Sequence, residues 1–187
     1  MQTRWWLAVG VVLVAVYMTV PGLPLPSVGV LPGEDAEAAP GDVTVCPASA
    51  KPANLSFTIN DMQGKSVSLA SYKGKVILLD FWATWCGPCK AAIPNFVELQ
   101  QEYGPKGLAV LGLSVDDTVD KLKPFVTEFK MNYPVLLGLG RDDVQDAFGP
   151  IWGIPTTFLI SRDGRICRKN TGIQGKAKYE RDIKALL

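Results

Sequence analysis

Two cysteines separated by only two residues are the most reactive feature of this 187-residue chain. Cys86 and Cys89 enclose Gly87 and Pro88, and a pair at this spacing can close into a disulfide and reopen when another thiolate attacks. An apolar run precedes the pair and a helical pattern follows, so Cys86 is expected at a helix N-terminus. Unpaired N–H groups and the helix dipole favour a thiolate there, whereas Cys89 falls inside the helix. The spacing predicts that Cys86 attacks and Cys89 resolves.

Other uses of a Cys-x-x-Cys pair agree less well with the sequence. A zinc ribbon needs a second pair of ligands, but Cys46 and Cys167 are isolated and far apart. A c-type haem site needs a histidine directly after the second cysteine, whereas Lys90 stands there and the chain has no histidine. A purely structural disulfide stays an alternative, although such a short loop removes little entropy from the unfolded chain. We therefore expect no metal, and no cofactor other than the redox-active disulfide itself.

The residues around this pair resemble the active site of thioredoxins. The sequence 85–90, Trp-Cys-Gly-Pro-Cys-Lys, is the thioredoxin form of the motif, and Pro94 matches the kink proline of the active-site helix. Residues 153–156 match the loop whose proline is cis and faces the disulfide. The resemblance covers about residues 53–187 and points to the TlpA/ResA-like branch, the membrane-tethered extracytoplasmic thioredoxins. It implies a substrate-binding surface formed by Trp85, Gly87, Pro88, Ile154 and Pro155, with Gly172 beside it.

Asp80 ends an apolar run six residues before Cys86, so we expect it to be buried beneath the active site. Burial would raise the pKa of its carboxyl and make it a plausible proton acceptor for Cys89. Thioredoxins carry an aspartate here, and the alternative is a strand-end aspartate that only hydrogen-bonds the next turn. Two departures from the family pattern stand out. Residues 111–115 offer no lysine to pair with Asp80, and Ala92 replaces the glutamate of ResA-type cytochrome-maturation proteins.

Cys46 and Cys167 form a second potential pair. As free thiols in an oxidising compartment they would be liabilities, and their isolation indicates structure rather than catalysis. Some TlpA-like proteins tie the N-terminal segment to the sheet with a second bridge, so the resemblance implies a structural Cys46–Cys167 disulfide. Four cysteines allow three pairings, and one or both of these thiols could instead be buried and free. Trp152, three residues before the loop proline, likewise has two possible roles: it could line the substrate groove or pack in the core.

The N-terminal 52 residues have the composition of an export segment followed by a tether. Residues 1–22 contain Arg4 and then an uncharged apolar run from Trp5 to Val20, short for a membrane span and long for a signal peptide. We expect an uncleaved membrane anchor, with a removed signal peptide as the alternative. Either places the domain on the outer side of a bacterial inner membrane, anchored or periplasmic. Residues 23–52, rich in proline, alanine and acids, are expected to be a flexible tether to a domain at 53–187.

Apolar runs that alternate with helical patterns predict an α/β thioredoxin fold, a central mixed sheet flanked by helices. Strands are expected at 55–59, 66–69, 75–81, 108–115, 134–137, 156–161 and 165–169, and helices at 88–103, 119–130, 142–148 and 176–187. The first two strands would form an N-terminal β-hairpin across a turn at 61–64. The strand and helices in the middle would be the αβ insertion that is typical of TlpA/ResA-like proteins.

The charges and the resemblance together define the expected function. The chain has 19 Lys and Arg against 18 Asp and Glu, so nothing suggests a nucleic-acid partner. We expect an exported thiol:disulfide oxidoreductase that mainly reduces protein disulfides and takes its electrons from a membrane thiol carrier. Its expected process is cytochrome c maturation or extracytoplasmic thiol homeostasis, and Ala92 weakens the first of these. One alternative is a peroxiredoxin-type peroxidase, but such enzymes place a threonine three residues before the attacking cysteine, where this chain has Ala83. The other is a non-enzymatic binding module of the same fold.

Overall fold

The computed structural model describes residues 45–187; the expected anchor and most of the expected tether lie outside the described residues. Within the described part, no helix is both long enough and apolar enough to cross a membrane. The strands are β1 (Thr58–Asn60), β2 (Ser66–Ser68), β3 (Val76–Trp82), β4 (Leu108–Ser114), β5 (Val135–Leu137), β6 (Thr156–Ile160) and β7 (Ile166–Thr171). The helices are α2 (Gly87–Tyr103), α3 (Val119–Glu128), α4 (Asp142–Ala147) and α5 (Lys176–Lys184), with short 3-10 turns η1 (Leu69–Tyr72) and η2 (Gly104–Lys106).

Five strands form one mixed sheet in the order β5-β4-β3-β6-β7. Strands β3, β4 and β5 are parallel, whereas β6 runs antiparallel to both β3 and β7. Strands β1 and β2 pair with each other in a separate antiparallel hairpin. The expected α/β thioredoxin fold is confirmed, with its N-terminal hairpin and its inserted elements between β4 and β6.

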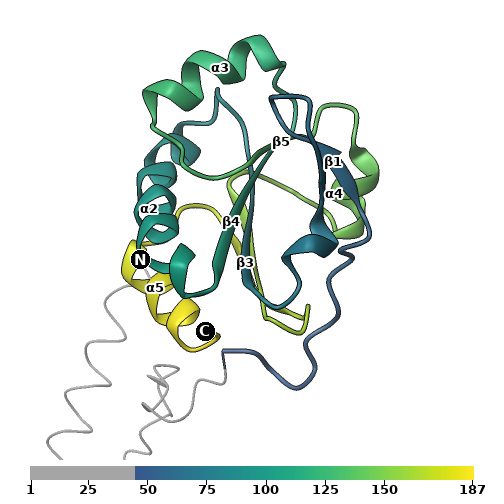
Figure 1. The fold of residues 1–187 in the computed structure, drawn as a ribbon, viewed down its shortest axis with the longest axis vertical. Coiled ribbons are helices and arrows are strands. Elements are labelled where there is room, and N and C mark those ends of the chain that lie inside the picture. The colour runs from purple at the N-terminus through teal and green to yellow at the C-terminus, as the bar shows by residue number, and fades with distance from the viewer. Residues whose placement is uncertain (1–44) are drawn as a thin grey trace, which may run out of the picture. The chain divides into compact units, whose positions relative to one another are not determined.

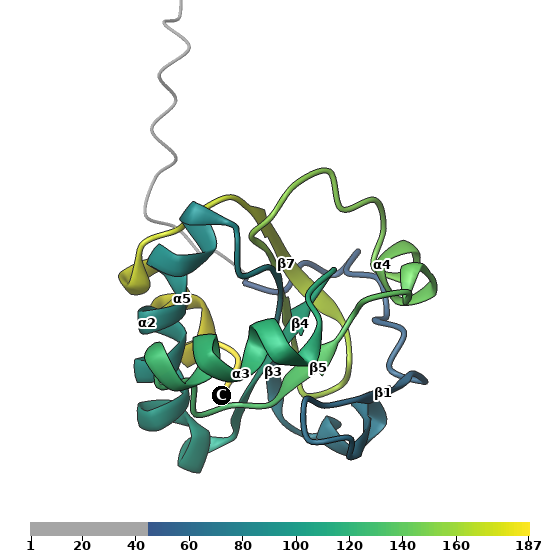
Figure 2. The same cartoon turned by 90° about the horizontal axis from the view of Figure 1, so that it is seen from above.

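Strand β3 is buried along its whole length because helices or the hairpin cover both faces of the sheet. Ile77, Leu79 and Phe81 pack in the cluster that includes the hairpin and α4. Leu78 and Trp82 point to the opposite face, which α2, α3 and α5 cover. Figures 1 and 2 show α2 and α5 on one side of the central strands and β1 and α4 on the other. This double cover explains the continuous apolar runs in the sequence.

The first predicted strand is wrong in its first half, because β1 begins only at Thr58. Asn54 Oδ1 accepts hydrogen bonds from the Ser56 backbone N–H at 3.1 Å and from the Ser56 hydroxyl at 2.6 Å. Such a local bond uses the N–H that a strand would offer to its neighbour, so it favours a turn. The 3-10 turn η1 was also not expected, whereas the other boundaries agree within about two or three residues.

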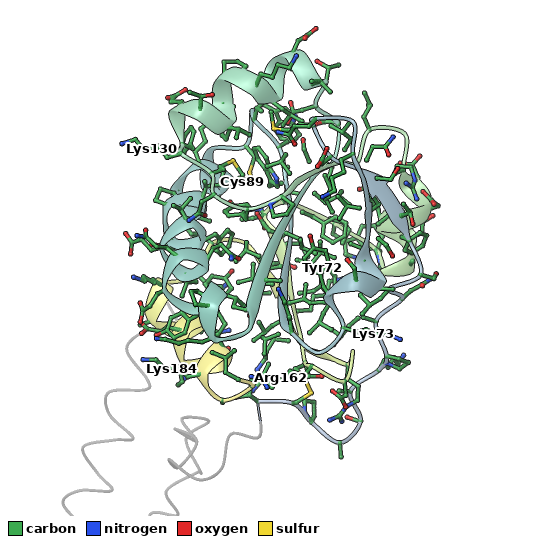
Figure 3. All side chains as sticks on the ribbon, in the orientation of Figure 1. Tyr72, Lys73, Cys89, Lys130, Arg162 and Lys184 are labelled. Carbon is green, nitrogen blue, oxygen red and sulfur yellow. A yellow bond between two sulfur atoms is a disulfide. The ribbon has the colours of Figure 1, made fainter. Side chains whose placement is uncertain are left out.

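The start of the described chain is attached to the edge of the sheet at β7. Pro52 bridges Arg165, and backbone hydrogen bonds of 2.8 Å join Ala53 to Gly164 and Ile166 to Lys51. A disulfide joins Cys46 to Cys167 at the beginning of β7, with an S–S distance of 1.98 Å. In Figure 3, Cys89 and Arg162, which lies in the β6–β7 turn, are toward opposite ends of the domain. This attachment therefore lies near the end of the sheet remote from the Cys86–Cys89 pair.

Candidate active site

Cys86 occupies the N-cap of α2, just beyond the C-terminal end of β3. Its backbone is extended, with φ −79° and ψ 108°, and Pro88 stands in the first turn, where a missing N–H has no cost. The Cys89 N–H donates a hydrogen bond to Cys86 Sγ at 3.2 Å, and a 2.07 Å bond joins the two sulfurs. In the reduced protein the same N–H would stabilise a Cys86 thiolate. Both cysteines are buried, with 4% of Cys86 and none of Cys89 exposed, so they differ mainly in position: Cys86 caps α2, whereas Cys89 lies within its first turn.

The loop before β6 faces this disulfide. The Ile154–Pro155 peptide bond is cis, and the Ile154 carbonyl oxygen lies 3.6 Å from Cys86 Sγ. The Gly172 N–H donates to the Pro155 carbonyl at 2.8 Å, which holds the loop against the residues after β7. Gly87 and Pro88 are exposed beside Cys86. The structure thus brings together the segments in which the sequence placed the substrate surface.

Three exposed apolar side chains belong to the loops around the disulfide. Trp85 adjoins Cys86 and is 61% exposed, Trp152 lies in the cis-proline loop and is 90% exposed, and Ile173 follows Gly172. The core-packing alternative for Trp152 is therefore wrong. Trp82, by contrast, is fully buried and packs on Phe125, with ring centroids 5.1 Å apart. Exposed aromatic residues at a reactive centre are suited to contact a protein substrate.

Asp80 is buried under α2, as the sequence predicts, with 1% of its surface exposed. Leu78 and Trp82 flank Asp80 on the same face of β3. Leu78 packs with Ala92 and Phe96 of α2, and Trp82 packs with Cys89 and Ile93 of α2. Asp80 therefore lies under α2 between these two groups of side chains. Burial raises the pKa of its carboxyl to about 8, because the charged form loses its hydration. Within residues 45–187 neither carboxylate oxygen has a hydrogen-bond partner, so the turn-binding alternative does not describe it.

Asp117, in the loop after β4, is a second buried carboxylate at this site and was not predicted from the sequence. Its Oδ2 accepts hydrogen bonds from the Thr84 N–H at 2.7 Å and the Ser114 hydroxyl at 2.8 Å. Its Oδ1 accepts from the Thr84 hydroxyl at 2.6 Å. The neighbouring Asp116 carboxylate accepts from the Trp85 indole N–H at 3.0 Å. These contacts fasten the loop that leads into Cys86 to the end of β4.

A signal for this arrangement was present in the sequence. Asp116 and Asp117 directly follow a buried parallel strand, and the carboxyl ends of neighbouring parallel strands meet at one edge of the sheet. Acidic residues at that position would therefore have been expected beside the segment after β3.

Comparisons with known proteins agree with this geometry. Residues 51–169 match the model of the AhpC/TSA family. Thiol-disulfide oxidoreductase ResA of Bacillus thuringiensis subspecies konkukian is 35% identical over 130 residues, which cover 70% of this chain and 74% of that protein. ResA of Geobacillus thermodenitrificans is 30% identical over the same shares. The crystal structure of a thioredoxin-family thiol:disulfide interchange protein from Chlorobium tepidum TLS superposes with a TM-score of 0.68 and 32% identity, over 75% of this chain and 99% of that chain. The chain belongs to the AhpC/TSA family, as a ResA-like thiol-disulfide oxidoreductase with the thioredoxin fold.

Proposed function

We propose that the protein reduces disulfides in other proteins on the outer side of a bacterial inner membrane. The observation that carries this proposal is the placement of Cys86. Its sulfur is at the N-terminus of α2 and 3.6 Å from the Ile154 carbonyl oxygen, in a loop flanked by exposed apolar residues. A substrate strand that pairs with the backbone of this loop would bring its own disulfide to Cys86.

The reaction transfers two electrons from the protein dithiol to the substrate disulfide. The Cys86 thiolate attacks one substrate sulfur, the substrate disulfide breaks, and the other substrate sulfur leaves as a thiolate. Cys89 then loses its proton, and its sulfur attacks Cys86 Sγ in the mixed disulfide. The second substrate sulfur leaves and takes up a proton, and the Cys86–Cys89 disulfide forms. The product state of the enzyme is the bond present in this structure.

Asp80 is the group that we propose to accept the Cys89 proton. It lies beneath the turn of α2 that carries Cys89, because Trp82, two residues further along β3, packs in the same cluster as Cys89. A carboxyl with a pKa of about 8 is a stronger base than an exposed aspartate and is still partly ionised at neutral pH. The proton therefore has an acceptor that is excluded from solvent.

The location and the electron source are part of the same proposal. The apolar N-terminal segment would hold or have exported the domain, and a membrane thiol carrier would reduce the Cys86–Cys89 disulfide after each turnover. Among substrates, we favour a broad set of extracytoplasmic proteins over apocytochrome c alone. Ala92 stands where ResA-type cytochrome-maturation proteins carry a glutamate, and it packs in the core beneath α2.

Reduction of insulin by the recombinant protein, with dithiothreitol as the electron source, tests the activity. Cys86→Ser should abolish turnover, whereas Cys89→Ser should stop after one step and accumulate a mixed disulfide through Cys86. The matched control is the double variant Cys46→Ser/Cys167→Ser, which lacks the other cysteine pair and should keep its activity. Loss of activity in the control alone, or trapping through Cys89, would contradict the assignment.

A comparison of two activities of the same protein distinguishes a reductase from a peroxidase. A peroxidase would consume hydrogen peroxide as Cys86 is oxidised to a sulfenic acid, which does not need Cys89 for the first step. We expect peroxide consumption near the rate of an ordinary thiol and insulin reduction well above the rate of dithiothreitol alone. The reverse order of the two activities would favour the peroxidase. A chain that contacts disulfide proteins without reducing them would be a binding module.

A further inference from the structure

Three buried polar side chains gather beneath the active site without partners among residues 45–187. They are Asp80, the Trp82 indole N–H and the Tyr133 hydroxyl, and all three side chains are more than nine-tenths buried. A buried polar group that makes no hydrogen bond costs about 1–3 kcal/mol, so three of them in one protein core need an explanation.

Gly112 on β4 is the residue that these three side chains share. It stands directly beside Asp80 in the parallel register of β3 and β4, so both residues face α2. A Cβ at Gly112 would lie 2.9 Å from Trp82 Nε1 and 3.2 Å from Cε2 of the Tyr133 ring. The charge of Asp80 also contributes to a raised pKa of the Tyr133 hydroxyl, after burial, as expected for groups that lie close together. The absent side chain of Gly112 leaves these groups next to one another.

The three groups are chemically complementary. The carboxylate only accepts hydrogen bonds, the indole N–H only donates, and the phenol does both. A buried water typically makes about three hydrogen bonds to otherwise unpaired polar groups. One water could accept from Trp82, donate to Asp80 and bond the Tyr133 hydroxyl, which would satisfy all three residues at once.

We propose that Asp80, Trp82 and Tyr133 bind an internal water beside Gly112, and that Tyr133 is a positioning residue that orients this water toward the Asp80 carboxylate. The inference rests on the proposed role of Asp80 as the acceptor of the Cys89 proton. Residues 111–115 of this chain hold no lysine. The phenol and the water would therefore stabilise the ionised carboxyl in place of a cation.

The other groups around Asp80 do not provide this stabilisation. Tyr179 of α5 is close enough for Asp80 to raise its pKa, after burial, but its hydroxyl is 3.1 Å from Thr157 Oγ1. Also on α5, Asp182 is paired with Lys178 at 3.4 Å. Cys89 on α2 packs in the cluster of Trp82, two residues along β3 from Asp80, and in the proposed function it is the proton donor rather than a stabilising partner. Tyr133 is thus the titratable neighbour whose hydroxyl is free for the water.

Tyr133→Phe removes this hydroxyl and keeps the ring. The titration of Asp80 can be followed by carboxyl ¹³C NMR in the full-length protein in detergent micelles, in both redox states. Because the ionised carboxyl loses a hydrogen-bonded water, we expect the titration midpoint to rise by about one pH unit. Tyr179→Phe is the matched control, since it removes the same atom from the other side of Asp80, and its midpoint should stay at the wild-type value. A midpoint unchanged in Tyr133→Phe, or an equal rise in Tyr179→Phe, would overturn the inference.

A second variant tests the packing at Gly112 rather than the hydroxyl. The methyl group of Gly112→Ala would lie 2.9 Å from Trp82 Nε1, which is too close, so it should push the indole N–H away from the proposed water and raise the Asp80 midpoint in the same direction while Tyr133 is intact. A folded Gly112→Ala protein with the wild-type midpoint would also overturn the inference.

Kinetics separates this inference from the proposed function. In the Tyr133→Phe protein, resolution of a trapped mixed disulfide should slow about tenfold near pH 7 and recover at higher pH, in step with the midpoint. The NMR titration needs no turnover. If the wild-type protein fails to reduce insulin and the midpoint still rises in Tyr133→Phe, only the proposed function fails. If reduction is intact and the midpoint is fixed, only the role of Tyr133 fails.

Discussion

At the level of single residues, burial rather than ion pairing determines the properties of the Asp80 carboxyl. The side chain is enclosed by the packing of β3 against α2, and no cation is placed beside it in the described residues. The ionised form of this buried carboxyl therefore destabilises the folded state. Such a group is suited to accept a proton where solvent is excluded, and the loss of stability can be measured.

Asp80→Asn should make the oxidised protein more stable at high pH. The folded-state pKa of about 8 lies above the ordinary aspartate value of 3.8, so the folded state binds the Asp80 proton more tightly than the unfolded state does. Ionisation of Asp80 lowers the free energy of unfolding of the wild type. This loss is absent below about pH 4, grows as the pH rises, and reaches its full size above about pH 8. The variant should therefore match the wild type near pH 4 and exceed it by several kcal/mol near pH 9. Urea unfolding at both pH values measures the difference, and an advantage that does not depend on pH would contradict the burial argument.

Asp80→Asn should also slow the resolution of a mixed disulfide near neutral pH. The wild-type rate should rise with pH as Asp80 ionises, through a midpoint near 8, because only the carboxylate can accept the Cys89 proton. The variant should lack this rise until the Cys89 thiol itself ionises. Stopped-flow kinetics between about pH 6 and 9 provides the measurement. Equal profiles for both proteins would make Asp80 purely structural.

At the level of elements, the sequence predicted the long elements well and the loop contacts poorly. Strands β3 and β4 are continuous apolar runs, and helix α2 begins at a capping residue with Pro88 in its first turn, so their positions follow from local pattern. The attachment of Thr84 to Asp117 spans 33 residues and depends on how the ends of β3 and β4 meet, which no local pattern contains. For the same reason, the cluster of Asp80, Trp82 and Tyr133 emerged only from the structure.

Asp117→Asn should loosen the segment that leads into Cys86. Each carboxylate oxygen accepts from a donor, so the amide NH₂ would face either the Thr84 hydroxyl or the Thr84 N–H. Leaving such buried groups unpaired should lower the free energy of unfolding by about 1–3 kcal/mol and slow insulin reduction. Asp116→Asn is the matched control, since its exposed amide can still accept from Trp85, and its stability should change by less than about 0.5 kcal/mol. Chemical denaturation of both proteins checks the difference, and equal effects would assign no special role to Asp117.

At the level of the whole molecule, the two disulfides lie in different parts of the domain and have different surroundings. The Cys86–Cys89 bond adjoins exposed apolar residues at the carboxyl ends of β3 and β4. The Cys46–Cys167 bond ties the start of the described chain to β7 and spans 121 residues of sequence. We expect the first to exchange with substrates and the second to contribute only stability.

Cys46→Ser should lower thermal stability without loss of reductase activity. Removing a long-range disulfide releases the unfolded chain and typically costs about 2–4 kcal/mol. Calorimetry of the Cys46→Ser/Cys167→Ser double variant avoids an unpaired thiol and gives the cleaner value. A transition temperature equal to that of the wild type would show that the hydrogen bonds of residues 51–53 with the 164–166 segment are sufficient to hold this end.

The direction of electron flow depends on the reduction potential of the Cys86–Cys89 pair. Gly87 and Pro88 provide no polar side chain to stabilise the Cys86 thiolate beyond the end of α2. The carboxylates of Asp116 and Asp117 bind the Thr84–Trp85 segment directly before Cys86, and with Asp80 where it is ionised they disfavour a further negative charge. Both effects favour the disulfide over the thiolate form, which makes the reduced protein a good electron donor. We expect a potential nearer to about −270 mV than to the roughly −120 mV of a strong periplasmic oxidant. Equilibration of the Cys46→Ser/Cys167→Ser variant in glutathione or dithiothreitol buffers isolates this one couple, and a value above about −160 mV would reverse the proposed direction while leaving Cys86 as the nucleophile.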